Sequence, residues 1–416
     1  MTGKAKSIIT VLDIGTSKIS CLMARMPEGS APEIIGYSSV QAKGIQAGAI
    51  WDIEAAKICV DNALRQAEKI AGRPITDVIV NISSGQIKST QLCQEMESPS
   101  GRAITQEDIQ HLVDNMLLTQ VPPGEEILHA IPVGYVVDRE HGRTDPRGIY
   151  GNTLEAQVHV ITVPETQTMN LLKVLDWCHV TVAAKVATPY ACALAVLNED
   201  EMDLGTTVID FGAGTTSYAI LIGGGLMKLG LIPSGGNEIT RSIAQTFNTD
   251  LQNAERKKVL NGAAMLTPHD ETEPVIIPIL GDDTGTNIQI MRADLVATII
   301  PHLDHILDDI NSSLSSEQDQ AFRSVANRYV LTGGGTGFDG IQDRVASILG
   351  GITRIGKTRQ IKNLPNKYDS CTFNVCVGLL VYAQMRMQNK VLDDFQEQPT
   401  LSGWIGKVKE WLKQNL

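Results

Sequence analysis

The sequence predicts an α/β protein made of two related halves, with a small α+β module inserted into the first half. Strand patterns alternate with amphipathic helix patterns along most of the 416 residues. One strand–turn–strand motif occurs near the start of the chain and again near residue 210. Residues 84–163 have a different sequence pattern, in which polar strands, one helix and a Pro-rich turn interrupt the first half.

Short apolar runs rich in β-branched residues predict the strands of the first half. They are residues 7–12, 19–24, 34–40 and 78–82. Apolar side chains at steps of three and four predict helices over residues 53–70, 166–178 and 189–197. Inside the insert, the same criteria predict strands over 86–93, 130–137 and 156–163 and a helix over 106–116.

The second half repeats this organisation. Strands are predicted over residues 207–210, 217–222, 226–233 and 328–331, with Gly223, Gly224 and Gly225 forming a hairpin turn. Helices are predicted over residues 237–262, 292–314, 337–349 and 374–388, whereas residues 263–290 are rich in turns and poor in strands.

These elements suggest the following domain boundaries. The first half comprises residues 1–83 and 164–203, the insert 84–163, the second half 204–236 and 291–388, and a smaller subdomain 237–290. The polar, Pro-containing residues 389–400 suit a linker, and residues 401–416 form a separate amphipathic segment.

Composition excludes several classes of protein. The formal net charge of −12 opposes binding to nucleic acid. The seven cysteines are scattered and form no C-x-x-C pair, so neither a disulfide framework nor a zinc site is indicated. The chain carries no signal-peptide pattern and no run of 18 apolar residues, so we expect a protein of the reducing cytosol.

The repeated motif can bind phosphate and magnesium. Glycines at residues 15, 212 and 214 let backbone N–H groups converge on an anion, while Lys18 adds a positive charge. Hydroxyl donors come from Thr16, Ser17, Thr215 and Thr216. Asp13 and Asp210 precede these loops and suit Mg²⁺ held through its water shell. A single copy fits a capped hairpin equally well, but two copies at the head of matching halves favour the phosphate site.

Two further patterns are weaker. Gly335, Gly337 and Gly340 match the glycine spacing of a dinucleotide fingerprint, but no acidic residue occurs between Asp343 and Asp369 to bind a ribose. His302 and His305 lie near acidic residues, but their spacing is not that of a metal site. A solvated helix face is therefore favoured over a metal site at these residues.

The chain resembles the actin/Hsp70/sugar-kinase ATPase superfamily and, within it, the FtsA family of bacterial cell-division proteins. The superfamily resemblance rests on residues 13–18, 210–216 and 331–335, which look like its phosphate-1, phosphate-2 and adenosine motifs, and on helices near 189–197 and 376–383. The family resemblance rests on residues 205–216 and 233–240, on Ala254, Glu255 and Lys258, and on the insert. It implies an actin-like fold of two RNase H-like halves with an SHS2-like insert.

The resemblance also implies function. Its cofactors would be ATP and Mg²⁺, with Glu255 and Lys258 near the ribose and adenine, Gly334 and Gly335 beneath the adenosine, and Gly235 and Gly236 closing the phosphate end. By position alone, Glu255 and Lys258 also fit a solvated helix pair. The implied partners are other copies of the chain in filaments, the FtsZ C-terminal peptide at residues 237–290, and later membrane proteins of the division site at the insert.

The sequence departs from the superfamily pattern at one position and from the family pattern at another. Hydrolysing relatives often carry an acid before the Pro of the first connecting helix, where this chain has Thr188. A threonine is a poor general base at neutral pH, so we expect slow hydrolysis at most. The family usually carries an Asp near Ser242, and the sequence offers no physical account of its loss.

The last sixteen residues have a helical period. One face carries Trp404, Ile405, Val408, Trp411, Leu412 and Leu416, and the other carries Lys407, Lys409 and Lys413. Such a helix spans roughly 24 Å, too short to cross a bilayer core of about 30 Å, but it suits an anionic lipid surface. This favours membrane binding over a docked terminal helix. The family resemblance implies that this membrane is the bacterial inner membrane, contacted on its cytoplasmic face at the division site.

Two rivals share the superfamily fold. A small-molecule kinase would need a substrate cleft with a catalytic Asp and would not use the amphipathic tail. A chaperone would need a substrate-binding β-domain after the ATPase core, and no such segment follows.

Overall fold

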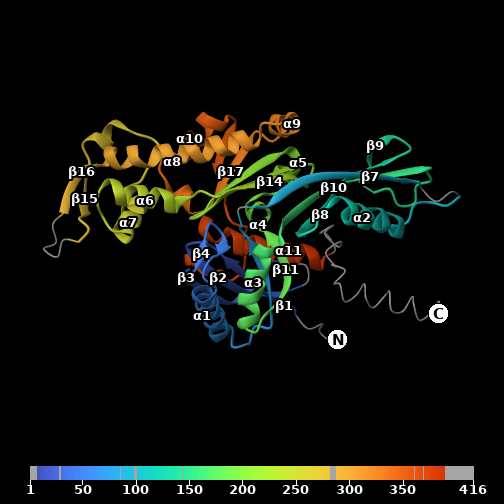
Figure 1. Ribbon diagram of the computed structural model, residues 1–416, viewed down its shortest axis with the longest axis horizontal. Helices are drawn as coiled ribbons and strands as arrows, with labels where there is room; N and C mark the ends of the chain where they lie inside the picture. The colour runs from blue at the N-terminus through green and yellow to red at the C-terminus, as the bar shows by residue number, and fades with distance from the viewer. Residues whose placement is uncertain are drawn as a thin grey trace.

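The computed structural model describes residues 7–27, 30–84, 86–97, 101–143, 145–281, 287–359, 361–368 and 370–388. Two five-stranded sheets form the body, a four-stranded sheet extends to one side, and a helical subdomain extends to the other (Figure 1). The predicted amphipathic tail lies outside the described residues. Within them, no helix combines the length and apolar character needed to span a bilayer.

The first half contains a sheet of order β11-β6-β1-β2-β3. Its strands are β1 (Ser7–Ile14), β2 (Lys18–Met26), β3 (Glu33–Gln41), β6 (Asp77–Ile82) and β11 (Thr181–Ala187). The hairpin of β4 (Ile45–Gln46) and β5 (Ala49–Ile50) follows β3. Helix α1 (Ile53–Ala71) starts at the capping side chain of Asp52, ends at Gly72 in the left-handed region, and packs with α3 (Glu165–Trp177).

The second half repeats this topology, as the recurring motif predicts. Its sheet has the order β14-β13-β12-β17-β18, with β12 (Thr206–Phe211), β13 (Thr216–Ile222), β14 (Gly225–Ile232), β17 (Arg328–Thr332) and β18 (Ile352–Ile355). In each half the first strand pairs antiparallel with the second and parallel with a later strand. The prediction of two related halves is therefore confirmed.

Two helices lie between the sheets of the two halves. They are α4 (Thr188–Val196) and α11 (Asn374–Met387). They cross so closely that a Cβ atom on Gly378 would lie 1.8 Å from the carbonyl oxygen of Ala191. One hydrophobic core contains both helices, residues on both faces of the first sheet and residues on one face of the second sheet.

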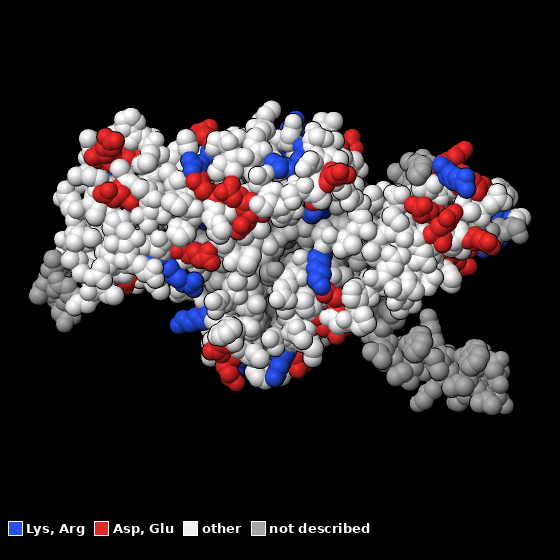
Figure 2. Space-filling model, turned by 45° about the horizontal axis from the view of Figure 1, so that its top comes forward, with Lys and Arg blue, Asp and Glu red and all other residues white. Residues whose placement is uncertain are grey.

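The insert forms its own sheet, of order β7-β10-β8-β9, covered by α2 (Gln106–Gln120). Its strands are β7 (Lys88–Glu97), β8 (Glu125–Val137), β9 (Glu140–Arg143) and β10 (Thr153–Pro164). Thr105 and Asp108 form a reciprocal capping box at the start of α2, and Arg102 binds both oxygens of Asp108. On the face seen in Figure 2, acidic side chains gather over this module, at the right of the view.

The subdomain of the second half differs from the sequence prediction. The single helix predicted over residues 237–262 is two helices, α6 (Gly236–Thr246) and α7 (Leu251–Asn261), because Asn248 takes a positive φ and Asp250 caps a new start. The turn-rich segment contains the hairpin of β15 (Pro274–Pro278) and β16 (Asn287–Met291). Helix α8 (Arg292–Ser313) covers the subdomain and matches its predicted range.

Some short elements were not predicted. Helices α5 (Glu199–Leu204) and α9 (Glu317–Val325) are brief and mostly polar, so they lack a clear apolar period. The predicted helix 337–349 begins later, as α10 (Ile341–Leu349), because residues 334–337 form a 3₁₀ turn.

A buried histidine joins the insert to the second half. In the neutral ring, His159 Nδ1–H donates to the Leu226 carbonyl at 2.8 Å, and Nε2 accepts from the Ser89 hydroxyl at 2.7 Å. That hydroxyl accepts in turn from the N–H of Leu229 at 3.2 Å. Burial, together with the charges of His129 and Lys228, lowers the pKa of His159 to about 4.

We expect this contact to weaken in acid. The unfolded chain binds a proton at His159 below pH ~6.5, whereas the folded chain resists protonation down to about pH 4, so folding free energy is lost as pH falls through this window. Between pH 7.5 and 5, the free energy of unfolding should fall by about 2 kcal/mol less in the His159→Gln variant than in the parent, measured by urea unfolding. His305→Gln, at an exposed position, is the control, and its free energy of unfolding should change with pH as that of the parent does. If the free energy of unfolding depended on pH equally in the parent and in His159→Gln, the role given to His159 would be contradicted.

Candidate functional site

A cavity of about 970 Å³ opens between the two halves. Every residue that the sequence suggested for nucleotide binding lines it. These residues are Asp13, Gly15, Thr16, Ser17, Lys18, Asp210, Gly212, Gly214, Thr215, Thr216, Gly235, Gly236, Glu255, Lys258, Gly334 and Gly335. Segments up to about 320 positions apart in the sequence therefore meet at one site.

The two repeated loops have the same local structure. Loop 1 (residues 13–18) closes with a hydrogen bond from Gly15 N–H to the Lys18 carbonyl at 3.0 Å, and loop 2 (residues 210–216) with one from Gly212 N–H to the Thr215 carbonyl at 3.0 Å. The loops touch, since a Cβ atom on Gly214 would lie 2.5 Å from Thr16 Oγ1. Among the described residues, the N–H groups at positions 16, 17, 213 and 214 have no hydrogen-bond partner. The loops thus offer donors to an anion from both sides.

The carboxyl groups of Asp13 and Asp210 lie at the strand ends below these loops. Burial, with the charge of Asp210, raises the pKa of Asp13 to about 7, while Lys18 and a hydrogen bond from Asn81 act against this shift. Burial raises the pKa of Asp210 to about 6. Two desolvated carboxylates that repel one another suit a divalent cation, so this pair fits Mg²⁺ held through its waters.

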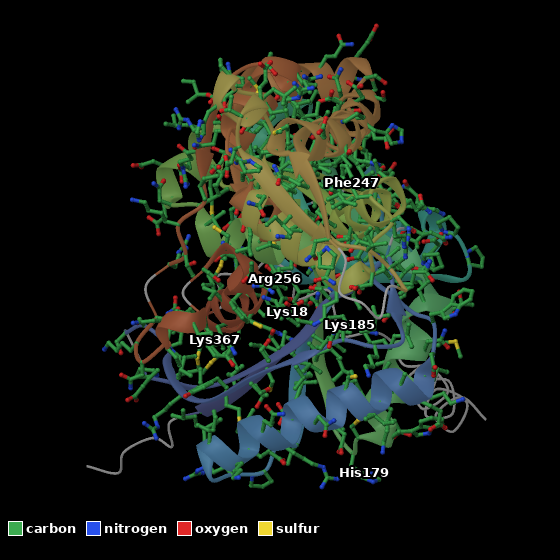
Figure 3. All side chains as sticks on the ribbon, turned by 90° about the vertical axis from the view of Figure 1, so that its left-hand side faces the viewer. Lys18, His179, Lys185, Phe247, Arg256 and Lys367 are labelled. Atoms are coloured by element: carbon green, nitrogen blue, oxygen red, sulfur yellow. The ribbon has the colours of Figure 1, made fainter. Side chains whose placement is uncertain are left out.

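Lys18 lies where the two halves meet (Figure 3). Its ammonium group stands 3.4 Å from the centre of the Phe373 ring, and burial lowers its pKa despite the carboxylates nearby. Helices α4 and α11 both begin at the cavity, with Thr188 and Val375 in its wall. Their positive ends and Lys18 favour a negatively charged ligand.

Gly235 and Gly236 close one end of the cavity against loop 2. The N–H groups of Gly236 and Asn237, at the start of α6, donate to the carbonyls of Gly212 and Ala213 at 3.0 and 2.7 Å. A Cβ atom on Gly235 would lie 2.6 Å from the Gly212 carbonyl oxygen. A larger residue at position 235 would therefore separate α6 from loop 2.

Lys258 is neither a solvated side chain nor a free ligand-binding group. It is 8% exposed, and its ammonium donates to the Gly236 carbonyl at 2.9 Å, to Thr240 Oγ1 at 2.8 Å and to Glu255 Oε2 at 2.6 Å. The solvated-pair interpretation is therefore wrong for Lys258. The lysine joins α7 to the Gly236 turn and orients the half-exposed Glu255 carboxylate along the cavity wall.

The third glycine segment forms the opposite wall. Gly333 has a φ of 83°, and a Cβ atom there would lie 2.3 Å from Asp210 Oδ1. At Gly334 a Cβ atom would meet only a Thr372 methyl carbon, at 3.9 Å, so this backbone faces open cavity. Phe338, Leu303 and Ile306 add apolar surface. The wall suits a flat, mostly apolar ring.

Thr188 lies at the first turn of α4 with its hydroxyl fully engaged. It donates to the Ile82 carbonyl at 2.9 Å, accepts from Asn81 Nδ2 at 3.1 Å and contacts Ser83 Oγ at 2.7 Å. A hydroxyl held in this way does not act as a base. Ser242 does not belong to the cavity wall.

The sequence motifs did not indicate several other residues of the wall. Helical spacing from known positions would have found some of them, since Gln252 and Val259 lie three before and four after Glu255. Asn237 lies three before Thr240 on α6, and Arg241 lies four after Asn237. Gln41, Ser83 and Thr372 carry no such signal, because only the folded chain brings them to the site.

The weaker motifs form no site of their own. Gly335 and Gly337 belong to the 3₁₀ turn of the cavity wall, and α10 begins after Gly340. His305 pairs with Asp309 at 3.7 Å on the exposed side of α8. Within the described part of the chain, no group of three His, Cys, Asp or Glu residues is placed to bind a metal.

Comparison with known proteins identifies the family. The model of the SHS2 domain inserted in FtsA matches residues 84–162, and the model of the cell division protein FtsA matches residues 207–378. The FtsA of Agrobacterium fabrum is 30% identical over 433 residues, covering 100% of this chain and 96% of that protein. This chain belongs to the FtsA family. The FtsA of Escherichia coli K12 is 28% identical, with 98% of both chains covered.

Solved structures place the family's fold among actin-like ATPases. A PilM–PilN type IV pilus biogenesis complex has a TM-score of 0.64 at 17% identity and covers 90% of this chain and 98% of its own. Spiroplasma citri MreB5 bound to ADP has a TM-score of 0.55 at 13% identity, covering 92% and 98%. The MamK double helical filament has a TM-score of 0.52 at 14% identity, covering 91% and 98%. The predicted fold class is confirmed.

We expect the Asp210→Asn variant to stabilise the protein without ligand. Because burial raises the pKa of Asp210 to about 6, its ionised form is costly at pH 7.5, and the uncharged amide removes that cost. The Tm should rise by about 2 °C or more in scanning calorimetry without nucleotide. If the carboxylate pair holds Mg²⁺, addition of Mg²⁺ and ATP should raise the Tm of the parent but not that of the variant.

The matched control is Asp203→Asn, which removes a carboxylate on α5, a helix that contributes no residue to the cavity wall. It should keep the parent's response to Mg²⁺ and ATP. A lower Tm for Asp210→Asn without ligand would contradict the role given to the paired carboxylates.

Proposed function

We propose that this chain is an ATP-binding, filament-forming scaffold of the bacterial division site, which links FtsZ to the cytoplasmic face of the inner membrane. The observation that carries the ATP site is that all suggested nucleotide-binding residues line one cavity between actin-like halves. Family membership supports the role in division.

ATP would lie across this cavity with its phosphates between the two repeated loops. The amides and hydroxyls of loops 1 and 2 and the charge of Lys18 would bind the phosphates, and Asp13 and Asp210 would hold Mg²⁺ through water. The wall at Gly334 and Gly335 would accept the adenosine, and Glu255 would accept a hydrogen bond from the ribose. When bound, Mg²⁺ would neutralise phosphate charge.

The cavity favours ATP as a conformational ligand over rapid hydrolysis. The side chain nearest the superfamily's catalytic position is Thr188, whose hydroxyl is held by Asn81, Ser83 and the Ile82 carbonyl. It leaves no carboxylate there to take a proton from water. ATP can still act by drawing the two halves together, since its ligands come from both.

Purified protein should therefore bind ATP with Mg²⁺ yet hydrolyse it more slowly than about 1 s⁻¹, measured by phosphate release. The Thr188→Val variant keeps the shape of the side chain without the hydroxyl, and its rate should stay within about two-fold of the parent rate if the hydroxyl is not catalytic. Hydrolysis of many ATP molecules per second by the parent would overturn this account. So would a Thr188→Val variant that no longer hydrolyses ATP.

The partners follow from the surfaces of the subdomains. Exposed apolar side chains of the 237–290 subdomain, among them Leu260, Leu266 and Ile276, support docking of the FtsZ C-terminal peptide there. The insert at 84–163 would receive later membrane proteins of the division site, and the body would form filaments with other copies. Many linked copies would multiply a weak membrane affinity.

The membrane foot would be the amphipathic segment 401–416, with Trp404 and Trp411 at headgroup level and its lysines against anionic lipid. The Trp411→Glu variant should lower binding to phosphatidylglycerol vesicles at least about ten-fold in a sedimentation assay, since it places a charge on the apolar face. Trp51→Glu, which alters an exposed tryptophan of the body, is the control and should bind as the parent does. Undiminished binding by Trp411→Glu would disprove the membrane foot.

A further inference from the structure

A second cavity, of about 360 Å³, lies between the turn that precedes β3 and the end of α11. The turn before β3, the end of α11 and the segment after β18 form its walls. Its lining is half polar and half apolar, with Arg359 and Gln388 among the polar residues and Pro32, Ile361 and Val381 among the apolar ones. None of these residues belongs to the nucleotide cavity.

Arg359 brings an incompletely satisfied positive charge to this cavity. Its backbone N–H donates to the Ala195 carbonyl at 3.0 Å, and Nη2 donates to the Leu197 carbonyl at 2.6 Å, which fixes the side chain. Its Nε atom is buried and has no hydrogen-bond partner among the residues described. Burial lowers the pKa of the guanidinium, against the opposing charge of Glu199. A buried donor without a partner is costly, so an anion in the cavity would satisfy it.

The chain around Arg359 is basic in an otherwise acidic protein. Residues 344–368, here named the basic segment, hold six Lys or Arg and no Asp or Glu, while the whole chain has a net charge of −12. Arg344 and Arg354 are neutralised by Asp304 and Glu201. The exposed Lys357, Lys362 and Lys367 form no ion pair within the described part of the chain.

Backbone hydrogen bonds tie the basic segment to the first half at Lys362. The N–H of Lys362 donates to the Pro32 carbonyl at 3.0 Å, and its carbonyl accepts from the N–H of Ile34 at 3.0 Å, so the segment adds to the edge of β3. In Figure 3 Lys367 lies to the left of Lys18, and its charge contributes to lowering the pKa of Lys18. The backbone at Lys362 is therefore held in place before any ligand arrives.

The membrane-binding sequence starts beside this cavity. Gln388 lines the cavity and directly follows α11, and the predicted linker 389–400 and the tail 401–416 come next. A linker of that length reaches at most roughly 40 Å, so a membrane-bound tail keeps the basic segment close to the lipid headgroups. The acidic remainder of the body would be repelled by the same surface.

We propose that the basic segment and the Arg359 cavity form a second membrane contact, which binds the phosphate headgroup of an anionic phospholipid and orients the body on the bilayer. The proposal rests on the membrane foot of the proposed function and adds a headgroup site on the body itself. Arg359 would bind the phosphate, the apolar wall of Pro32, Ile361 and Val381 would contact the glycerol carbons, and the three lysines would face neighbouring headgroups.

The test compares full-length variants on vesicles of phosphatidylcholine with and without phosphatidylglycerol. The variant Lys357→Gln/Lys362→Gln/Lys367→Gln should lose at least about ten-fold in affinity for the anionic vesicles, and the loss should shrink in high salt. The matched control Lys43→Gln/Lys69→Gln/Lys173→Gln removes three exposed lysines elsewhere and should stay within about two-fold of the parent. Equal binding by the two triple variants would overturn the proposal.

Two further arms separate the possible explanations. Trp411→Glu tests the tail alone, so parent-like binding by that variant would refute the membrane foot whatever the triple variants do. Glycerol 3-phosphate tests a soluble source of the same phosphate. If it raises the Tm of the parent but not of Arg359→Gln, while the lysine variant binds vesicles normally, the cavity takes a free phosphate and the lipid proposal is wrong.

Discussion

The mutual repulsion of two buried carboxyl groups is the constraint on which this structure depends. Asp13 and Asp210 stand at equivalent places in the two halves, and burial raises the pKa of both. Such a pair is stable only where positive charge can reach it. Lys18, the first turns of α4 and α11, and the space for a hydrated cation all lie around this point. The nucleotide cavity thus surrounds the negative charge of Asp13 and Asp210, which the positive groups of the protein neutralise only in part.

Much of the fold could be predicted because its determinants are local. The strand–turn–strand motif needs glycine at positions 15 and 212, and each glycine closes a turn with the same hydrogen bond. Amphipathic helices such as α1 and α8 carry their period in the sequence itself. The cavity wall was predictable for the same reason, since loops 1 and 2 and the segment at Gly333 each have a distinctive composition.

The remainder depends on contacts between distant segments. Lys258 has the sequence signature of a solvated pair with Glu255, and only the approach of α6 buries it against the Gly236 carbonyl. The break between α6 and α7 depends on a positive φ at Asn248, which ordinary helix periodicity does not report. Arg359 meets the turn at Pro32 because the chain crosses back from the second half to the edge of β3. The sequence around each of these residues carries no pattern that predicts these long-range contacts.

The shared core around α4 and α11 also governs how the protein is made. Apolar residues of both sheets pack on this helix pair, and Gly378 allows α11 to approach Ala191. The ribosome therefore completes β1, β2 and α4 long before α11, the helix that covers them, has been synthesised. At about 5–20 residues per second, the interval between positions 196 and 387 lasts roughly 10–40 s. During that time the first half exposes the apolar surface that α11 will cover, and so this half is open to capture by chaperones until the last core helix emerges.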